Sequence, residues 1–330
     1  MRRVIKPIIL AIVLLVFFAT CSLSKKMTVD NYTSINAPPG TKELAINFYC
    51  DETEATNQYW LDFLHWIKIV YGANSEEYKL AMPDTTIWKM IYPDSIARDL
   101  SCYYLRYPGY RNLPVVGVSQ QQTKEYAKWR SDRVLEQILI TLGIIEISKK
   151  PTKDNHFTIE RYFNGEIKKL KDVNIAYYPE YRLPNIQERQ YIITSIDYLD
   201  YFDYNKTNIP RRHKKHDEKS LDHFPFIWSD VSVEQDTSFN LRGLRYEMYE
   251  MKKNRVPPMI MAQIYSGSYI YHLRGNVAEW LDEPNISAGG SWHDKLEDIL
   301  ASDTSSCNKA NAWTGFRCVC QWKKWENKNE

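Results

Sequence analysis

The sequence predicts an α+β fold in which short strands and two main helices are joined by long loops. A strand is expected over Leu44–Tyr49, where the side chains alternate in character. Apolar residues at helical spacing follow Thr56, and a second amphipathic helix is expected from about Gln121, behind the capping residue Ser119. From Phe224 onward, strands and turns predominate. The 24 Tyr and 10 Trp residues fit a loop-rich fold with an aromatic core.

The spacing of apolar and turn residues predicts how far each element extends. Residues 73–113 are expected to be irregular, because prolines interrupt them repeatedly. The second helix is expected to continue to about Ile147, and a third to run from about Ile186 to Tyr198. The first helix should bury one apolar face, formed by Trp60, Phe63, Leu64 and Ile67.

The chain opens with a segment that is typical of export. Basic residues precede an apolar run from Ile8 to Phe18, which is shorter than the ~20 residues of a membrane-spanning helix. This pattern predicts a signal peptide over residues 1–20. Cys21 follows directly and favours a lipoprotein, in which Cys21 becomes the acylated N-terminus and its acyl chains anchor the protein in a membrane. The alternative is an ordinary cleaved signal with an incidental cysteine.

The remaining residues predict one domain on a tether. Residues 21–37 are polar and aperiodic, as in a linker. The domain is expected over 38–323, with insertions at 148–178 and 200–222 and a tail at 324–330.

The charge balance argues against a polyanionic partner. The 43 basic and 41 acidic residues nearly cancel, so no nucleic-acid partner is implied. A basic cluster at Arg211–His216 favours a solvated loop, with an anion or partner contact as the alternative.

Three glycine and aromatic blocks near the C-terminus are the most informative feature. They follow one another as Gly275–Trp280, Gly289–Trp292 and Gly315–Cys318. Together with the segments Asp51–Asn57 and Pro114–Ser119, they resemble the formylglycine-generating-enzyme (sulfatase-modifying-factor) family over roughly residues 38–322. The motif residues are Gly275, Trp280, Gly289, Gly290, Ser291, Trp292, Gly315, Phe316 and Arg317.

The resemblance carries expectations about fold, activity and location. It implies a single α+β domain that is related to C-type lectins, in a family that converts a protein cysteine into formylglycine. The wording of Trp66–Gly72 and Trp129–Val134 resembles the lipoprotein branch associated with gliding motility and type IX secretion. That branch implies an outer-membrane lipoprotein whose partners are other envelope and secretion-machinery proteins.

The catalytic chemistry of the family is not matched here. The resemblance implies a copper ion held by two cysteines between the second and third blocks, because soft thiolates suit Cu(I). This stretch contains only Cys307, so no copper and no catalytic residues are expected. A metal held by Cys307 and His293 is a disfavoured alternative, as is an oxygen-dependent enzyme with altered ligands.

Two motif side chains have both a functional and a structural interpretation. Ser291 matches the serine beside the family's active site, but a turn hydroxyl is favoured. A triad of Ser291, His293 and Asp294 is not expected, because a triad needs groups that converge in a hydrogen-bonded chain.

The resemblance also implies structural calcium at the first block. Asn276 and Glu279 could supply oxygen ligands to Ca²⁺. The alternative is a tight turn in which Asn276 is left-handed and Trp280 packs inside. If calcium binds, a calcium-assisted glycan or peptide binder becomes a third possible function.

The cysteine pattern leaves the thiol pairing open. In the family, a cysteine at the position of Cys318 pairs with one where this chain has Ala127. Cys318 is therefore expected to be buried and free, or to pair with Cys50 or Cys102. Pairing among the body's cysteines cannot be read from sequence; they are Cys50, Cys102, Cys307, Cys318 and Cys320.

The sequence therefore favours a membrane-anchored, non-catalytic member of this family that acts as a structural or interaction subunit. Its many Tyr and Trp residues are suited to protein interfaces. Nucleotide-binding, zinc-protease and serine-hydrolase motifs are absent from the sequence.

Overall fold

A computed structural model describes residues 37–92, 94–173, 175–195, 270, 272–294 and 303–326. The predicted signal peptide, Cys21, the tether up to residue 36 and the 200–222 insertion lie outside these residues, as do the last four residues of the tail. From Pro38 onward the chain forms one compact unit.

The fold begins with a β-hairpin. Strands β1 (Thr41–Ala45) and β2 (Phe48–Asp51) pair antiparallel, and Asn47 between them has a φ of 57°. The prediction of a single strand over Leu44–Tyr49 is therefore wrong. Asparagine tolerates the left-handed region better than most residues, and at this position it reverses the chain.

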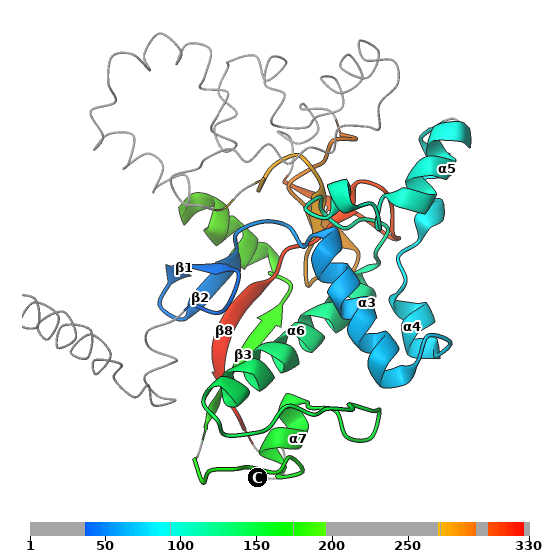
Figure 1. Cartoon of the computed structure of the whole chain (residues 1–330). Coiled ribbons are helices and arrows are strands. Elements are labelled where there is room, and N and C mark those ends of the chain that lie inside the picture. The colour runs from blue at the N-terminus through cyan, green and yellow to red at the C-terminus, as the bar shows by residue number, and fades with distance from the viewer. Residues whose placement is uncertain are drawn as a thin grey trace, which may run out of the picture. The chain divides into compact units, whose positions relative to one another are not determined.

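The last strand of the chain lies in the middle of the first sheet. The strand order is β1-β2-β8-β3, so β8 (Val319–Lys324) lies between β2 and β3 (Tyr177–Arg182). Cys320 of β8 faces Tyr49 on one side and Tyr181 on the other, and both pairings are antiparallel. In Figure 1 the red β8 runs between the blue hairpin and the green β3. The sheet thus joins the two ends of the domain.

Both main helices are confirmed. Helix α3 (Asn57–Tyr71) is capped by Thr56, which accepts a hydrogen bond from the backbone of Tyr59, and it buries the predicted apolar face. Helix α6 (Gln120–Thr141) starts with a capping box at Ser119 and Gln122. The expected continuation to Ile147 is wrong, because Gly143 follows the helix with a φ of 64° and ends it.

The expectation that residues 73–113 are irregular is also wrong. They form α4 (Glu76–Ala81), the 3-10 helix η1 (Thr85–Met90), α5 (Asp94–Tyr103) and the 3-10 helix η2 (Pro108–Tyr110). Pro108 occupies the start of a helix, where its missing N–H costs nothing. Prolines here divide short helices and do not abolish them.

In the part of the chain that the structure describes, two further helices lie beyond α6. The polar stretch 148–178 contains α7 (Ile159–Phe163), whose first N–H donates to the Asp132 carboxylate at 2.8 Å. The third predicted helix is helical over 186–195, and its expected end at Tyr198 lies outside the described residues.

A second sheet carries the glycine and aromatic blocks. Its order is β6-β5-β4-β7, formed by β4 (Ala278–Trp280), β5 (Ile286–Ala288), β6 (Thr304–Ser306) and β7 (Thr314–Gly315). Strands β4 and β7 are parallel, and the other pairs are antiparallel.

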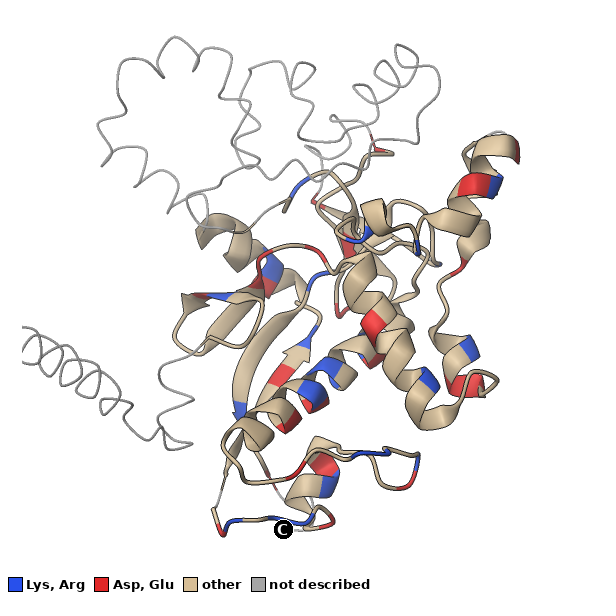
Figure 2. Ribbon diagram, viewed as in Figure 1, with Lys and Arg blue, Asp and Glu red and all other residues tan. Residues whose placement is uncertain are grey.

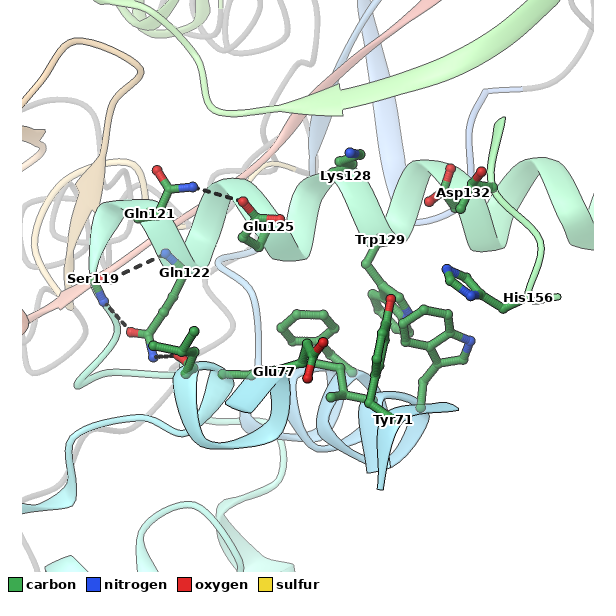
Figure 3. Close-up of a pocket in the computed structure, with 16 residues that line it drawn as sticks. Tyr71, Glu77, Ser119, Gln121, Gln122, Glu125, Lys128, Trp129, Asp132 and His156 are labelled. Carbon is green, nitrogen blue, oxygen red and sulfur yellow. Dashed lines mark hydrogen bonds between the residues drawn. The ribbon is translucent and has the colours of Figure 1, made fainter. Parts of the chain in front are cut away.

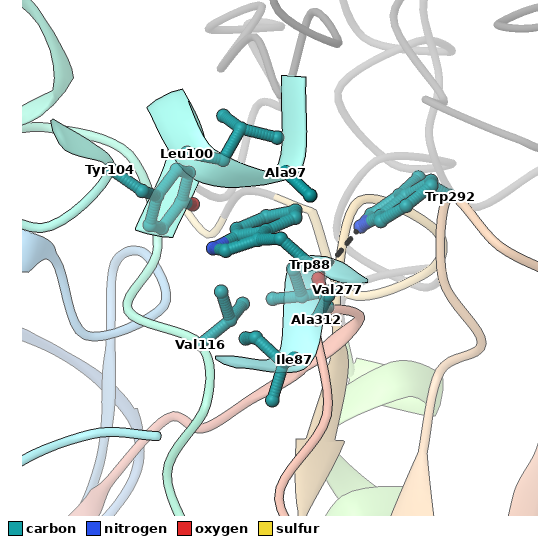
Figure 4. Close-up of a cluster of buried hydrophobic side chains, with 9 residues drawn as sticks. All are labelled: Ile87, Trp88, Ala97, Leu100, Tyr104, Val116, Val277, Trp292 and Ala312. Atoms are coloured by element: carbon teal, nitrogen blue, oxygen red, sulfur yellow. Dashed lines mark hydrogen bonds between the residues drawn. The ribbon is translucent and has the colours of Figure 1, made fainter. Parts of the chain in front are cut away.

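The core is largely aromatic. Trp60 stacks on Tyr126 at 5.5 Å, and the Phe316 ring packs edge-on against both. A second cluster forms around Trp88 of η1, which lies between α5 and the C-terminal loops (Figure 4). Its other members are Ile87, Ala97, Leu100, Tyr104, Val116, Val277, Trp292 and Ala312.

The charged side chains follow the balance of the composition. Figure 2 shows basic and acidic residues side by side along α6. Among the described residues, no helix combines the length and apolarity needed to cross a membrane.

Candidate functional site

The structure brings the three glycine and aromatic blocks together. Glu279 on β4 lies opposite Gly315 on β7, which joins the first block to the third. The Gly275 N–H donates to the Gly289 carbonyl at 2.8 Å, and the Trp292 N–H donates to the Asn276 carbonyl at 2.9 Å. The blocks therefore form one layer of interlocked turns around β4.

Glycine is needed in this layer because the backbones approach closely. Gly289 has a φ of 88°, and a Cβ there would lie 2.6 Å from the Leu273 carbonyl oxygen. A Cβ at Gly315 would lie 2.9 Å from the Val115 carbonyl oxygen. Both distances are well inside van der Waals contact, so a side chain would displace the neighbouring backbone.

A buried ion network lies beneath this layer. Arg317 donates to Oε1 of Glu279 at 2.9 Å, and Arg189 donates to Oε2 at 2.9 Å. All three residues are 1% exposed. Buried charges persist only when they are paired, so the third block and the 186–195 helix are held to β4 through one carboxylate.

A second buried carboxylate extends the network to the N-terminal part of the domain. Glu54 accepts a hydrogen bond from Asn276 at 2.9 Å and lies 3.3 Å from Nδ1 of His272 and 3.9 Å from Arg317. Burial opposes its ionisation, but His272, Arg317 and the Asn276 hydrogen bond together lower the pKa of Glu54. Burial raises the pKa of Glu279, and its two arginines offset part of that effect.

Asp51 completes the connection to the first sheet. It accepts from Arg130 at 2.7 Å and from the Cys318 N–H at 3.0 Å, while its own carbonyl accepts from Arg317 at 2.8 Å. Arg130 in turn lies over the Tyr181 ring, 4.0 Å from its centroid. The network thus joins the two sheets and α6.

Both residues predicted as calcium ligands belong to this network. The Asn276 side chain donates to Glu54, and both oxygens of Glu279 accept from arginine. Asn276 has a φ of 55°, and Trp280 is buried with its indole N–H on the Val118 carbonyl. Both oxygens of Glu279 thus already have arginine partners, and calcium binding at this turn stays a prediction.

Ser291 has the contacts of a turn hydroxyl. It is fully buried, donates to Asp294 at 2.6 Å and accepts from the His293 N–H at 3.2 Å. The His293 ring stacks on Trp313 with centroids 4.1 Å apart. These contacts close the turn after the second block.

A cavity of about 360 Å³ lies between the second and third blocks, beside Cys307. The Cys307 sulfur accepts from Asn311 at 3.3 Å, donates to the Lys309 carbonyl at 3.6 Å and lies 3.8 Å from the Thr314 hydroxyl. Burial raises the pKa of Cys307, which keeps the sulfur protonated at neutral pH. Asp294 and Ser305 also line this cavity.

The donors around this cavity do not fit the family's copper ion. Two thiolates are needed, but one thiol is present among hydroxyl, amide and carboxylate groups. Cys50 and Cys320 are buried in the first sheet, and Cys318 is buried directly before β8. Burial raises the pKa of Cys50 to about 12, and it raises the pKa values of Cys318 and Cys320 as well.

Cys318 takes the first of its two predicted states. It is buried and free, as is Cys50, and Cys102 on α5 is exposed and also free. No disulfide joins the cysteines of the described residues.

The chain matches the sulfatase-modifying factor enzyme 1-like domain over residues 23–322, and it belongs to this family. Among solved structures, one described as the crystal structure of CarF shares 17% identity, covering 83% of this chain and 86% of that chain with a TM-score of 0.37. No curated protein matches the chain.

Sequence reasoning identified the three blocks but missed the network that they support. Arg189 and His272 carried no local signal, because their partners are 90 and 218 residues away along the chain.

Proposed function

We propose that this chain is a non-catalytic member of its family and works as an interaction subunit anchored at the cell envelope. The observation that carries the proposal is the single protonated thiol of Cys307, where the family's oxidative chemistry needs a pair of thiolates. The arginines and the carboxylate around the blocks also form ion pairs with one another, which supports a structural role for them. A domain of this kind acts through its surface.

Copper binding and cysteine oxidation test the absence of catalysis. The purified chain is titrated with Cu(I) beside a Cys307→Ala variant and then incubated with a cysteine-containing sulfatase peptide in air. We expect no stoichiometric copper that depends on Cys307 and no formylglycine in the peptide by mass spectrometry. One equivalent of copper that is lost in Cys307→Ala, or conversion of the peptide, would overturn the proposal.

Membrane attachment is tested separately through Cys21. We expect the N-terminal peptide of the mature protein to begin at Cys21 and to carry acyl chains. In a Cys21→Ser variant the protein should leave the membrane fraction. An unmodified N-terminus at another residue would contradict the lipoprotein proposal.

The assignment to gliding motility or type IX secretion depends on the wording of Trp66–Gly72 and Trp129–Val134 and stays a prediction. Deletion of the gene should then impair surface spreading or protein export. Expression of the Cys307→Ala chain should restore the impaired process.

A further inference from the structure

A large aromatic cavity lies between helices α3, α4 and α6. Its volume is about 800 Å³, and none of its lining residues borders the Cys307 cavity. In Figure 3 the Tyr71 and Trp129 rings lie between α6 and the α3–α4 pair. Asp132 and His156 lie at one end of the view, and Ser119 and Gln122 lie at the other. The three glycine and aromatic blocks contribute no residue to this cavity, which makes it a separate candidate site.

Aromatic rings form one wall of the cavity. Trp66 packs against Trp129 at 6.3 Å and against Tyr71 at 6.0 Å, and Phe63 lies 5.2 Å from Trp129. The faces of such rings carry negative potential and attract cations. Arg133 shows this preference within the protein, since its guanidinium carbon lies 4.7 Å from the Trp66 ring centroid.

The charged lining is mainly acidic. Glu77, Glu125 and Asp132 line the cavity, with Lys128 as the basic residue opposed to them. Burial lowers the pKa of His156, which is therefore neutral above pH 7. The lining consequently carries two more negative than positive charges.

Asp132 is the most deeply placed of these carboxylates. It is 8% exposed and accepts one hydrogen bond, from the Ile159 N–H, but it has no ion pair within the described residues. Glu77 is paired at 3.3 Å with Lys153, whose side chain is 71% exposed. Lys128 and Arg133 favour its charged form without forming an ion pair with it, and burial still raises its pKa. A cationic ligand in direct contact would offset the remaining cost of burying this carboxylate.

The indole of Trp129 supplies a second unsatisfied group. Its Nε1 is buried and has no hydrogen-bond partner. Leaving a buried donor unpaired is unfavourable, so a ligand that brings an acceptor would be favoured here. A peptide carbonyl is such an acceptor, and a free ammonium ion is not.

We propose that this cavity binds a lysine or arginine side chain carried on an extended segment of a partner protein. The cationic group takes the place between the aromatic wall and Asp132, and a backbone carbonyl of the same segment accepts from Trp129. The inference deepens the proposed function, because it gives the interaction subunit a contact site of defined chemistry.

The charge of the lining distinguishes this ligand from a glycan. A neutral sugar could also stack on the rings, but it would bring no positive charge to Asp132. Selectivity for a cation is therefore the property to be measured.

The experiment uses the full chain and two acetylated, amidated glycine–serine peptides, one with a central lysine and one with norleucine. Binding is followed by tryptophan fluorescence, because Trp66 and Trp129 line the cavity, and by calorimetry. We expect the lysine peptide to bind at least ten-fold more tightly than the norleucine peptide at pH 7.5. Equal affinities, or no binding of either peptide at millimolar concentration, would overturn the proposal.

Three variants locate the site. Asp132→Asn should abolish the preference for lysine. Trp129→Phe should lower the affinity for both peptides several-fold, because it removes the indole donor but keeps an aromatic ring. Asp62→Asn, on α3 but outside the lining, should change neither affinity. The lysine-to-norleucine ratio is compared within each variant, since partial unfolding lowers both affinities equally.

Two further results are decisive. If a neutral oligosaccharide binds the chain and its affinity is unchanged in Asp132→Asn, the proposal of a cationic ligand is overturned in favour of a glycan. Copper and formylglycine are measured on the same preparations. Oxidation activity with intact lysine selectivity would contradict only the non-catalytic function. Absence of oxidation together with loss of lysine selectivity would contradict only this site.

Discussion

Arg317 and Glu279 form a fully buried ion pair in which Nε and Nη2 of the guanidinium both lie 2.9 Å from Oε1 of the carboxylate. The pair joins the last glycine and aromatic block to the first. Arg189 occupies the other carboxylate oxygen, so a single glutamate holds three segments of the chain together.

Replacing this glutamate should destabilise the fold strongly. Glu279→Gln leaves two buried guanidinium groups without their counter-charge, and we expect a loss of about 3–5 kcal/mol in the free energy of unfolding. The control is Glu76→Gln, whose pair with Lys79 is on the surface and should contribute below about 1 kcal/mol. Urea denaturation measures both, and equal effects would show that the network has no special role.

Gly289 should tolerate a methyl group much less well than another left-handed glycine. Gly289→Ala places a Cβ 2.6 Å from the Leu273 carbonyl and 2.7 Å from Arg189, and we expect a loss of about 3 kcal/mol or more. Gly165 has a similar φ of 80° but open space around it, so Gly165→Ala should lose only about 1–2 kcal/mol of backbone strain. Thermal unfolding of both variants separates steric contact from strain, and matching losses would rule out the contact.

Asp132 should make stability depend on pH. Burial raises its pKa to about 6, opposed by the Ile159 hydrogen bond, so the folded state binds a proton more tightly than the unfolded chain. The cost of the buried charge is absent below about pH 4, grows as the pH rises and is complete above about pH 6. Asp132→Asn should therefore be more stable than the natural chain at pH 7.5, by at most about 3 kcal/mol, with no advantage at pH 4.

The other charges near Asp132 stay in place in this comparison. They belong to Lys128, Arg133 and Glu136 on α6 and to His156 and Glu160 beside it. A stability difference that is independent of pH would mean that Asp132 titrates normally.

The cysteines of the domain should differ sharply in reactivity. Cys102 is exposed, whereas Cys50 and Cys320 in the first sheet and Cys318 directly before β8 are buried with raised pKa values. Iodoacetamide at pH 8 should label Cys102 within minutes and these buried cysteines only after denaturation. Peptide mapping reads each site separately, and rapid labelling of Cys318 in the native protein would contradict the described packing.

The elements with local signals were the ones that could be predicted. Thr56 and Ser119 mark helix starts through their own side chains. The buried face of α3 could be predicted because its apolar residues recur at helical spacing within one short segment. The hairpin at Asn47 was missed because one residue in an unusual φ region overrides an alternating pattern.

The site was harder to predict because its contacts are long-range. The motif blocks could be found because each is a short contiguous sequence. The pairing of Glu54 with His272 and of Glu279 with Arg189 could not be found in this way. The aromatic cavity was missed for another reason: the stripe of Phe63 and Ile67 was correctly assigned to the core, and nothing in it indicates that Trp66 borders an open space.

The central place of β8 in its sheet bears on how the protein is made. Residues 319–324 must be synthesised before they can pair with both β2 and β3, although β2 is synthesised near the start of the domain. Such distant pairings form slowly. A nascent chain therefore lacks the middle strand of this sheet until residues 319–324 have been synthesised, and β2 and β3 cannot be joined before then.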